Sequence, residues 1–418
     1  MVSGRRQTTE PGEEHHEPEG THLGPPQTSH VKRRWARWSA RRKRDAWAVL
    51  VVLLLGVGTL ITLSYGSLRV WGQVQVAQPG TAPVGGTPTS TTRGSPVPGA
   101  TVTVRTAQAR IYPFPGSQVG LMQPAVDGRG NVWVGEMYAN RFARLDSQTG
   151  AITTWDPPDA KNGLMTTTVD AQGTIWFVEQ GANYIGRFDP TQQTFRTFSL
   201  GTVHGRQMGP QDLQFDASGK LWFTAAAGGR IGRLDPATGA IQMWPVPVPR
   251  AGSPSAPFSL TVLPNGQIWF GYLTGGVVGH LDSATGRVTL YPLADPQATV
   301  FSIAHDAKGR IWFTEIVPGK LGMIDSASGR VTELPVPAVS GNLAALYRLV
   351  VTNNGEVWFV DDGANALVRY TPGKATYTFF QLPASSGGGL YGLTRDGVGR
   401  LWFTTSGPST NAVGEVSP

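Results

Sequence analysis

Hydrophobic and polar positions follow one pattern that repeats along residues 105–418. Each repeat has a short apolar run, a turn of the form D-x-x-G or N-x-G, and a triplet L/I/V-W-F. A G-x-h-D segment (h apolar), a second turn such as A-T-G, and a run ending in proline complete it. The apolar runs are short, and none shows helical spacing. The pattern therefore predicts four short strands in each repeat.

One tryptophan marks each repeat, and the spacing between them gives the period. These tryptophans are separated by 43, 46, 47, 43, 46 and 44 residues, and they are Trp133, Trp176, Trp222, Trp269, Trp312, Trp358 and Trp402. Four strands in a period of 40 to 50 residues are typical of a β-propeller. We therefore expect an all-β, seven-bladed β-propeller of four-stranded blades at 105–418, with the tryptophans packed between blades.

The last repeat lacks its fourth strand. It begins at Tyr391 and ends in the sequence AVGEVSP. The segment ARIYPFPG at 109–116 has the pattern of the missing strand and precedes the first complete repeat. We predict that it pairs with the last three strands and closes the ring, which would remove exposed sheet edges.

The net charge of +7 is concentrated before the repeats, so it does not indicate a nucleic-acid-binding domain. Eight Lys and Arg residues lie within 32–44, and the next uncharged, apolar stretch runs from residue 46 to residue 66. A helix of 21 residues spans a bilayer core of roughly 30 Å. The bases on its N-terminal side predict a single-pass membrane helix at 46–66, with a cytoplasmic N-terminus and the propeller outside the membrane.

The flanking segments fit this arrangement. Residues 1–45 read as a disordered basic cytoplasmic tail, and residues 73–104, rich in Pro, Thr and Gly, as a flexible linker. A cleaved signal peptide, a DNA-binding basic arm and a buried core helix are the alternatives for the apolar segment. The chain has no cysteine, which excludes disulfides, thiolate metal sites and cysteine nucleophiles.

The repeats resemble a known family. The stretches DAQGTIWFVEQGANYIGRFDP (170–190) and DAKGRIWFTE (306–315) are similar to the streptogramin lyase (virginiamycin B lyase-like) family. The resemblance implies a seven-bladed propeller that opens cyclic depsipeptides by Mg²⁺-assisted elimination at an ester. It also implies a histidine in a P-H pair that opens an innermost strand. A glutamate in W-F-T-E, fourteen residues later, closes the next strand.

Reading these two positions in every repeat defines the candidate site. The strand-opening residues are Met122, Met165, Gln211, Phe258, Phe301, Tyr347 and Tyr391, and none is histidine. The strand-closing residues are Glu136, Glu179, Ala225, Tyr272, Glu315, Asp361 and Thr405. The turn between Met122 and Glu136 is centred on Arg129, so we expect the two to be cross-strand neighbours. The two sets would then form concentric rings at one mouth of the channel.

Two interpretations of these rings remain open. In the first, the Met, Phe, Tyr and Gln residues form a pocket floor. The acids Glu136, Glu179, Glu315 and Asp361 would then bind a cationic ligand or, chiefly through Glu136, Glu179 and Glu315, Mg²⁺ or Ca²⁺. In the second, the acids are solvated rim groups and the apolar residues plug the channel. His204 lies in a loop leading to the mouth, whereas His280 and His305 read as ordinary structural residues.

The sequence supports more than one function. Without the family's histidine, we expect a membrane-anchored extracytoplasmic module that binds a small molecule, a glycan or a protein at the mouth. The alternative is a divergent carbon-oxygen lyase, or another metal-assisted enzyme, that uses the four acids with Tyr347 or Tyr391 as proton carrier. A sensor that signals through its single helix is a third possibility.

Overall fold

The computed structural model describes residues 92–94, 100–116, 119–158, 163–252, 254–316, 319–339, 342–386, 389–406 and 411–417. The tail expected at 1–45 and the membrane helix expected at 46–66 lie outside these residues, as does most of the linker expected at 73–104. Within the described ranges, no helix is long and apolar enough to cross a membrane.

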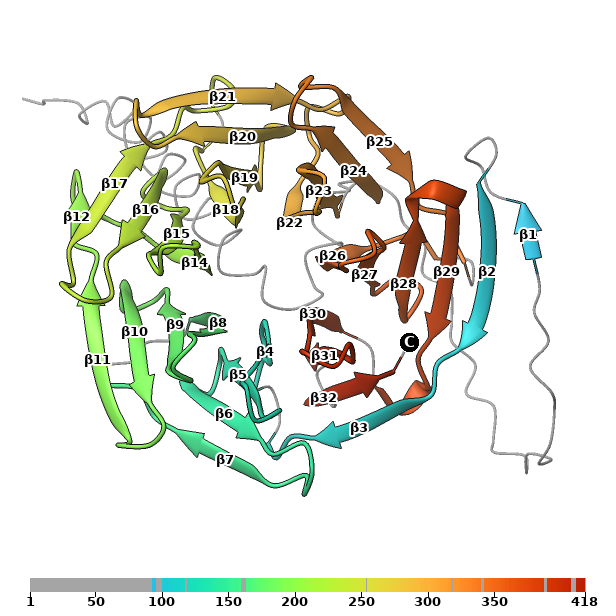
Figure 1. Cartoon of the computed structure of the whole chain (residues 1–418), viewed down its shortest axis with the longest axis horizontal. Coiled ribbons are helices and arrows are strands. Elements are labelled where there is room, and N and C mark those ends of the chain that lie inside the picture. Colours follow the sequence, from blue (N-terminus) through green and yellow to red (C-terminus); the bar gives the residue numbers. More distant parts are fainter. Residues whose placement is uncertain are drawn as a thin grey trace, which may run out of the picture. The chain divides into compact units, whose positions relative to one another are not determined.

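Seven antiparallel sheets surround a central axis in the described part of the chain, which confirms the seven-bladed propeller (Figure 1). The first strand of each sheet lies next to the axis and the later strands follow outward. Blades 1 to 3 are β4 (Ala125–Val126), β5 (Val132–Glu136), β6 (Arg141–Leu145) and β7 (Ile152–Trp155); β8 (Leu164–Val169), β9 (Ile175–Glu179), β10 (Tyr184–Asp189) and β11 (Thr194–Ser199); and β14 (Pro210–Phe215), β15 (Leu221–Ala225), β16 (Arg230–Leu234) and β17 (Ile241–Pro245).

The remaining blades follow the same plan. They are β18 (Pro257–Val262), β19 (Ile268–Tyr272), β20 (Val277–Asp282) and β21 (Arg287–Pro292); β22 (Val300–His305), β23 (Arg310–Glu315), β24 (Lys320–Asp325) and β25 (Val331–Pro335); β26 (Leu346–Val351), β27 (Val357–Asp361), β28 (Ala366–Thr371) and β29 (Thr376–Gln381); and β30 (Leu390–Arg395), β31 (Leu401–Ser406) and β32 (Asn411–Val416). A small hairpin, β12 (Thr202–Val203) with β13 (Arg206–Gln207), connects blades 2 and 3.

The ring closes as the sequence predicts. β3 (Ala109–Pro113) pairs with β32 from Ala109↔Val416 to Pro113↔Ala412, so it is the fourth strand of blade 7. One feature differs from the expectation. Residues 101–104, at the end of the expected linker, belong to β2 (Thr101–Thr106), which pairs in parallel with β29. The alternation of Thr and Val suits a strand, and β1 (Thr92–Gly94) pairs with its other edge.

The recurring D-x-x-G-x-h-W sequence is explained by one hydrogen bond. In blade 2, Asp170 accepts backbone N–H groups within its own turn, and its second oxygen accepts the indole N–H of Trp176 at 2.9 Å. The same indole bond occurs in blades 1, 3, 5 and 7 at 2.8–3.0 Å. The tryptophans are buried, which confirms their place in the core. The turn aspartate therefore fixes the tryptophan between the blades.

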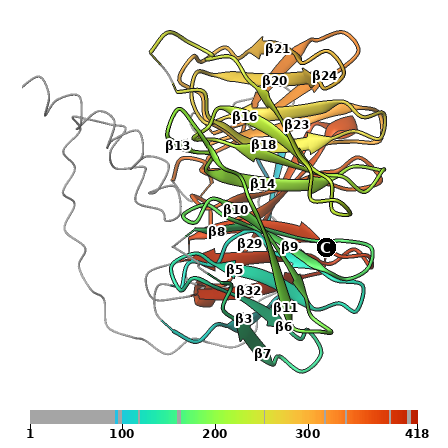
Figure 2. The ribbon, with the colours of Figure 1, turned by 90° about the vertical axis from the view of Figure 1, so that its left-hand side faces the viewer.

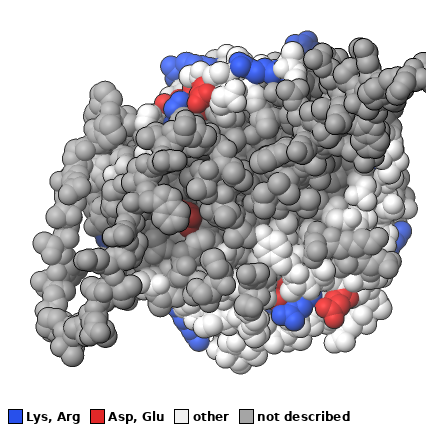
Figure 3. Space-filling model, turned by 180° about the vertical axis from the view of Figure 1, so that it is seen from behind, with Lys and Arg blue, Asp and Glu red and all other residues white. Residues whose placement is uncertain are grey.

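The two ends of the ring are built from different connections, seen from the side in Figure 2. We call the end where first strands begin and second strands end the mouth face. The opposite end, which carries the D-x-x-G and D-x-x-T-G turns, is the turn face. Figure 1 looks onto the turn face, where β32 ends, and Figure 3 looks onto the mouth face from behind.

Candidate functional site

The seven strand-opening residues fill the centre of the channel, and we call them the plug. The plug consists of Met122, Met165, Gln211, Phe258, Phe301, Tyr347 and Tyr391, and each is buried. Phe301 is its centre, because its ring centroid lies 5.0 Å from that of Phe258, 5.1 Å from Tyr347 and 5.4 Å from Tyr391. Such separations are those of favourable edge-to-face and tilted aromatic pairs. The plug residues therefore pack together at the axis, with Phe301 at their centre.

The expected pairing between the two rings is wrong by one residue. The residue opposite Glu136 is Leu121, not Met122, and the residue opposite Glu179 is Leu164, not Met165. Blades 2 to 7 show a register shift between this pair and the rest of the hairpin, and in blade 2 it lies between Leu164 and Thr167. A β-bulge adds one residue to the inner strand. Two consecutive side chains per blade, rather than one, are therefore placed at the channel.

The four strand-closing acids are not solvated rim groups. Glu136, Glu179 and Glu315 are 0% exposed and Asp361 is 1% exposed. Each lies at the end of the second strand of its blade. Glu136 forms an ion pair with Arg141, directly opposite on β6, with Oε2 to Nε at 2.7 Å. Burial nevertheless raises the pKa of Glu136, and the Arg141 guanidinium lowers it only in part.

Glu315 has a different environment from Glu136. Lys320 stands directly opposite on β24, but its Nζ bonds Glu333 Oε1 at 3.1 Å instead. Among the described residues, neither oxygen of Glu315 accepts a hydrogen bond. Burial, followed by the nearby Glu333 carboxylate, raises the pKa of Glu315 to about 8. Burial therefore favours the neutral form of the Glu315 carboxyl group.

Asp361 supports a mouth connection. Its Oδ1 accepts the backbone N–H groups of Ala345 at 3.0 Å and Ala364 at 3.2 Å. Burial raises its pKa to about 6 in spite of these bonds. The four acids therefore lie in four different blades. Among the described residues, no group of three or more His, Asp and Glu side chains is arranged to hold a metal ion.

The three histidines of the repeat region lie away from the plug. His280 stacks on Trp269 with a centroid distance of 4.6 Å, and burial lowers its pKa. His305 lies within 2.9 Å of the Thr261 hydroxyl, near the turn-face end of β22, and burial also lowers its pKa. His204 is exposed in the β12–β13 hairpin with a φ of 50°. None of these three described histidines has a printed contact with the four acids.

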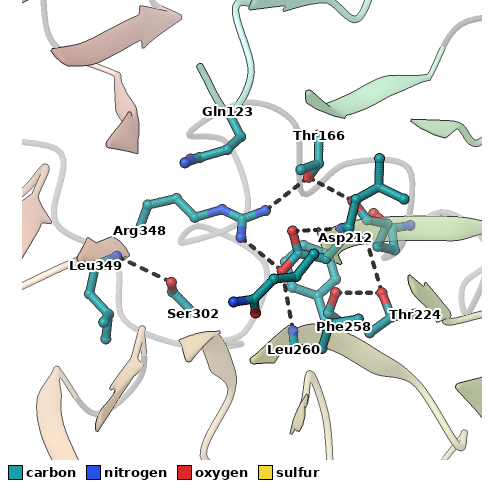
Figure 4. Close-up of polar contacts among 12 residues, drawn as sticks. Gln123, Thr166, Asp212, Thr224, Phe258, Leu260, Ser302, Arg348 and Leu349 are labelled. Atoms are coloured by element: carbon teal, nitrogen blue, oxygen red, sulfur yellow. Dashed lines mark hydrogen bonds and ion pairs between the residues drawn. The ribbon is translucent and has the colours of Figure 1, made fainter. Parts of the chain in front are cut away.

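A polar layer lies directly beneath the plug, and the sequence reading did not single it out. We call it the belt. It is formed by the residue after each plug residue: Gln123, Thr166, Asp212, Ser259, Ser302, Arg348 and Gly392. Arg348 reaches across the channel, with Nη1 3.1 Å from Asp212 Oδ2 and Nη2 3.2 Å from the Thr166 hydroxyl (Figure 4). This ion pair joins blade 6 to blade 3.

The belt contributes to the contacts between neighbouring blades. Asp212 Oδ2 also accepts the backbone N–H of Leu260, and Thr166 donates to the Gln211 carbonyl at 2.8 Å. Ser302 accepts the N–H of Leu349 at 3.1 Å. A signal was present in the sequence, because the belt positions contain one acid and one base among neutral residues. This signal could be interpreted only once the β-bulge was known. In a regular strand, the residue after each plug residue would face away from the channel.

Apolar side chains of the mouth connections pack against the plug. Met137, Met208, Leu273 and Ala345 are buried against the plug, and Ile316 is partly buried there. Tyr138, Val248 and Leu343 are the large hydrophobic side chains exposed on the described mouth connections. Charged or titratable residues on these connections are Asp156, His204, Arg206, Arg250, Asp295 and Asp362. Such a surface suits a ligand or partner with apolar groups.

Comparison with known proteins places these features in context. The model of the virginiamycin B lyase family matches residues 107–416. A streptogramin B lyase structure is 27% identical, with a TM-score of 0.64, and the match covers 74% of this chain and 97% of that one. Virginiamycin B lyase from Staphylococcus aureus is 24% identical, with a TM-score of 0.64 and coverage of 74% and 99%. A catalytically inactive variant of that enzyme with quinupristin is 23% identical, with a TM-score of 0.65 and coverage of 74% and 99%. No curated protein matches the chain.

Proposed function

Since the chain belongs to the virginiamycin B lyase family, we propose that it is a membrane-anchored, extracytoplasmic propeller of that family that binds a ligand at its mouth face without lyase activity. The observation that carries this proposal is the composition of the plug. All seven strand-opening positions hold Met, Gln, Phe or Tyr, and these side chains pack against one another. A proton on carbon needs a positioned base, and the plug offers none.

The acids support binding better than catalysis. A metal-assisted elimination needs carboxylates that converge on a cation reached by the substrate. Glu136, Glu179, Glu315 and Asp361 are buried in separate blades, and Glu136 is already paired with Arg141. A Mg²⁺ or Ca²⁺ site at Glu136, Glu179 and Glu315 would therefore require rearrangement of the mouth connections. The divergent lyase remains the second hypothesis, and the experiment below separates the two.

The proposed ligand has apolar or aromatic parts. The exposed side chains Tyr138, Val248 and Leu343 lie around the same end of the channel as the buried Met137, Met208 and Leu273. A small molecule, a glycan with an apolar aglycone or a protein segment could supply such groups. Nucleic acid is not the proposed partner, because the excess of bases lies at 32–44 and not on the propeller.

Membrane anchoring rests on the basic segment 32–44 and the uncharged segment 46–66. We propose a single-pass protein with its N-terminus in the cytoplasm and the propeller outside. A C-terminal tag should be cleaved by external protease on intact cells. Protection of the tag in intact cells, with cleavage after lysis, would contradict this topology.

The activity test uses residues 100–418, which contain the four strands of each of the seven blades. The protein is incubated with Mg²⁺ and a streptogramin B antibiotic, and retention of the antibiotic is followed by chromatography. Elimination opens the ring without a change in mass, so retention is the informative signal. We expect no change beside an active control enzyme. A Mg²⁺-dependent shift that Glu315→Gln abolishes would replace this proposal with the divergent lyase.

Binding is measured separately by thermal unfolding with a panel of peptides and glycans. A ligand that binds only the folded state raises the Tm with its concentration, as mass action requires. We expect at least one apolar or aromatic peptide or glycoside to do so. If none does at millimolar concentration, the small-ligand form of the proposal fails.

A further inference from the structure

One base at the mouth end of blade 3 lacks the acid that its counterparts have. Arg141, Arg230 and Lys320 occupy the same position, the first residue of the third strand in their blades. Arg141 lies opposite Glu136 and pairs with it, and Lys320 pairs with a glutamate of its own blade. Arg230 instead lies opposite Ala225. Blade 3 therefore carries an unbalanced cation where blades 1 and 5 carry an ion pair.

The Arg230 side chain also lacks the contacts that other arginines of the propeller make. It is half-buried, and its buried Nε has no hydrogen-bond partner among the described residues. Other arginines with an unpaired Nε have a second contact: Arg144, Arg187 and Arg369 stack on tryptophans, and Arg348 pairs with Asp212. Arg230 makes neither kind of contact with the described part of the chain. A partly desolvated charge of this kind favours binding of an anion.

The two mouth connections on either side of blade 3 carry bases and no acid. Residues 200–209 include His204 and Arg206, and residues 246–256 include Arg250. All three side chains are exposed. The described mouth connections that carry an acid follow β7, β21 and β27, and these acids are Asp156, Asp295 and Asp362. We call the group formed by His204, Arg206, Arg230 and Arg250 the basic sector of the mouth face.

Hydrogen bonds hold both of these connections. Asn183 is 6% exposed, accepts the backbone N–H of Met208 at 2.8 Å and donates to the Gly201 carbonyl at 2.6 Å, so one side chain fixes both ends of the β12–β13 hairpin. Figure 2 shows β13 on the side of the ring opposite the C-terminus. In the other connection, the Pro247 carbonyl accepts the Tyr272 hydroxyl at 3.0 Å. The bases therefore lie on anchored segments, which lowers the entropic cost of binding.

The chemistry of the basic sector restricts what it binds. The three arginines only donate hydrogen bonds, so a cation is unsuitable. A guanidinium group binds a carboxylate or a phosphate through two parallel hydrogen bonds. The half-buried position of Arg230 strengthens such a pair, because less water screens the charges. Val248, which is 55% exposed on the same connection as Arg250, adds an apolar surface beside the bases.

We propose that the basic sector binds the anionic group, a carboxylate or a phosphate, of the ligand at the mouth face. This inference rests on the proposed function, because it assigns the polar end of a ligand whose apolar part contacts the same face. Arg230 makes the central ion pair, since it has no partner within the described residues, and Arg206 and Arg250 contact the anion from the flanking connections. The ligand is therefore an acidic amphiphile.

The test uses two probes that differ only in charge, N-acetylphenylalanine and N-acetylphenylalanine amide. Calorimetry with the full-length protein in a mild detergent gives both dissociation constants, with detergent alone as the blank. We expect the acid to have a Kd at least about fivefold lower than that of the amide. This preference should decrease between about 20 mM and about 500 mM salt, because salt screens the arginines. Phenyl phosphate, titrated in the same way, distinguishes a phosphate preference from a carboxylate preference.

Variants locate the effect on the protein. Arg230→Met should raise the Kd of N-acetylphenylalanine by about tenfold and leave that of the amide within about twofold. Arg206→Gln and Arg250→Gln change exposed side chains and should each raise the Kd of the acid by about threefold. The matched control is Arg129→Gln, an exposed arginine in a turn on the turn face, which should change it by less than about twofold.

The outcomes separate this inference from the proposed function. If the acid and the amide bind equally, and only Leu343→Ser weakens them, the ligand site stays at the mouth face and the basic sector does not bind an anion. If Arg129→Gln weakens binding of the acid as much as Arg230→Met does, the attraction is non-specific and the inference is overturned. If neither probe binds, the result contradicts both this inference and the proposed binding of small aromatic ligands.

Discussion

Carboxylates at the two faces of this ring experience opposite electrostatic environments. On the turn face, Asp146 accepts the backbone N–H groups of Thr149 and Gln148, and these bonds lower its pKa. Asp325 does the same with Ser328 and Ala327, and its pKa is also lowered. On the mouth face, burial raises the pKa of Glu136, Glu315 and Asp361.

The direction of the pKa shift separates acids whose charged form stabilises the folded state from acids whose charged form is destabilised by burial. A carboxylate with a lowered pKa is stabilised in the folded state, and one with a raised pKa is destabilised in its charged form. Turn-face aspartates therefore contribute to the fold, and in blades 1, 2, 3, 5 and 7 one of them holds both its turn and its tryptophan. Mouth acids occur in four blades and are replaced by Ala225, Tyr272 and Thr405 in the others.

The largest expected effect lies at the channel centre, between the two faces. Arg348→Met should cost about 3–5 kcal/mol of unfolding free energy, because it leaves Asp212 as a buried, uncompensated charge. The matched control is Lys220→Met, which breaks the half-exposed Lys220–Asp235 pair on the turn face. That change should cost less than about 1 kcal/mol. Urea unfolding of both variants measures the difference, and equal costs would contradict the assignment of the Arg348 pair as the central link.

The next effect concerns pH and tests the mouth acids directly. Folded Glu315 has a pKa of about 8, above its ordinary value of 4.5. Between these values the folded state binds more protons than the unfolded state, so wild-type stability falls as pH rises from about 4.5 to about 8. The glutamine in Glu315→Gln does not ionise. The free energy of unfolding of this variant should therefore rise relative to that of the wild type across this pH range, by on the order of 2–4 kcal/mol.

The comparison with a turn-face acid gives the opposite sign. The lowered pKa of Asp325 contributes stability above the ordinary aspartate pKa and loses it as pH falls through the folded value. Asp325→Asn should therefore lose stability relative to the wild type at pH 7 and recover it in acid. Denaturant titrations at pH 3, 5, 7 and 9 measure both variants. A Glu315→Gln curve parallel to the wild type would show that Glu315 is ionised at neutral pH.

A smaller effect tests the turn face alone. Asp170→Ala removes the acceptor of the Trp176 indole and of two backbone N–H groups, and it should cost about 2 kcal/mol. In blade 4 the equivalent indole, that of Trp269, bonds the neutral amide of Gln267 at 3.2 Å. Gln267→Ala should therefore cost about half as much. Thermal unfolding compares the two, and a larger cost for Gln267→Ala would mean that charge is not what strengthens the turn.

The smallest expected change in stability serves the proposed function. Leu343 on the mouth face and Val398 on the turn face are both 81% exposed. Leu343→Ser and Val398→Ser should each change the unfolding free energy by less than about 0.5 kcal/mol. Of the two, only Leu343→Ser should reduce the affinity for a ligand that is found by thermal shift, and the Kd should rise by about threefold or more. If both variants reduced the affinity equally, the ligand would not be binding specifically at the mouth face.

The sequence by itself determined the blades, their number and their closure. Strand, turn and tryptophan recur at a fixed spacing, and each arises from neighbours along the chain, as the Asp170–Trp176 bond illustrates. The closing strand at 109–116 could be recognised because it repeats a pattern present in the other blades. Periodic, local information of this kind is visible in one sequence.

Only the tertiary structure decided what lies at the axis. Because of the bulge, Leu121 rather than Met122 lies opposite Glu136. No residue of the turn predicts this bulge from the sequence. Arg348 and Asp212 are 136 residues apart and meet because blades 3 and 6 are brought across one channel. Contacts between distant segments do not repeat along the chain, so no sequence pattern reveals them. They form only when the closed ring brings the segments together.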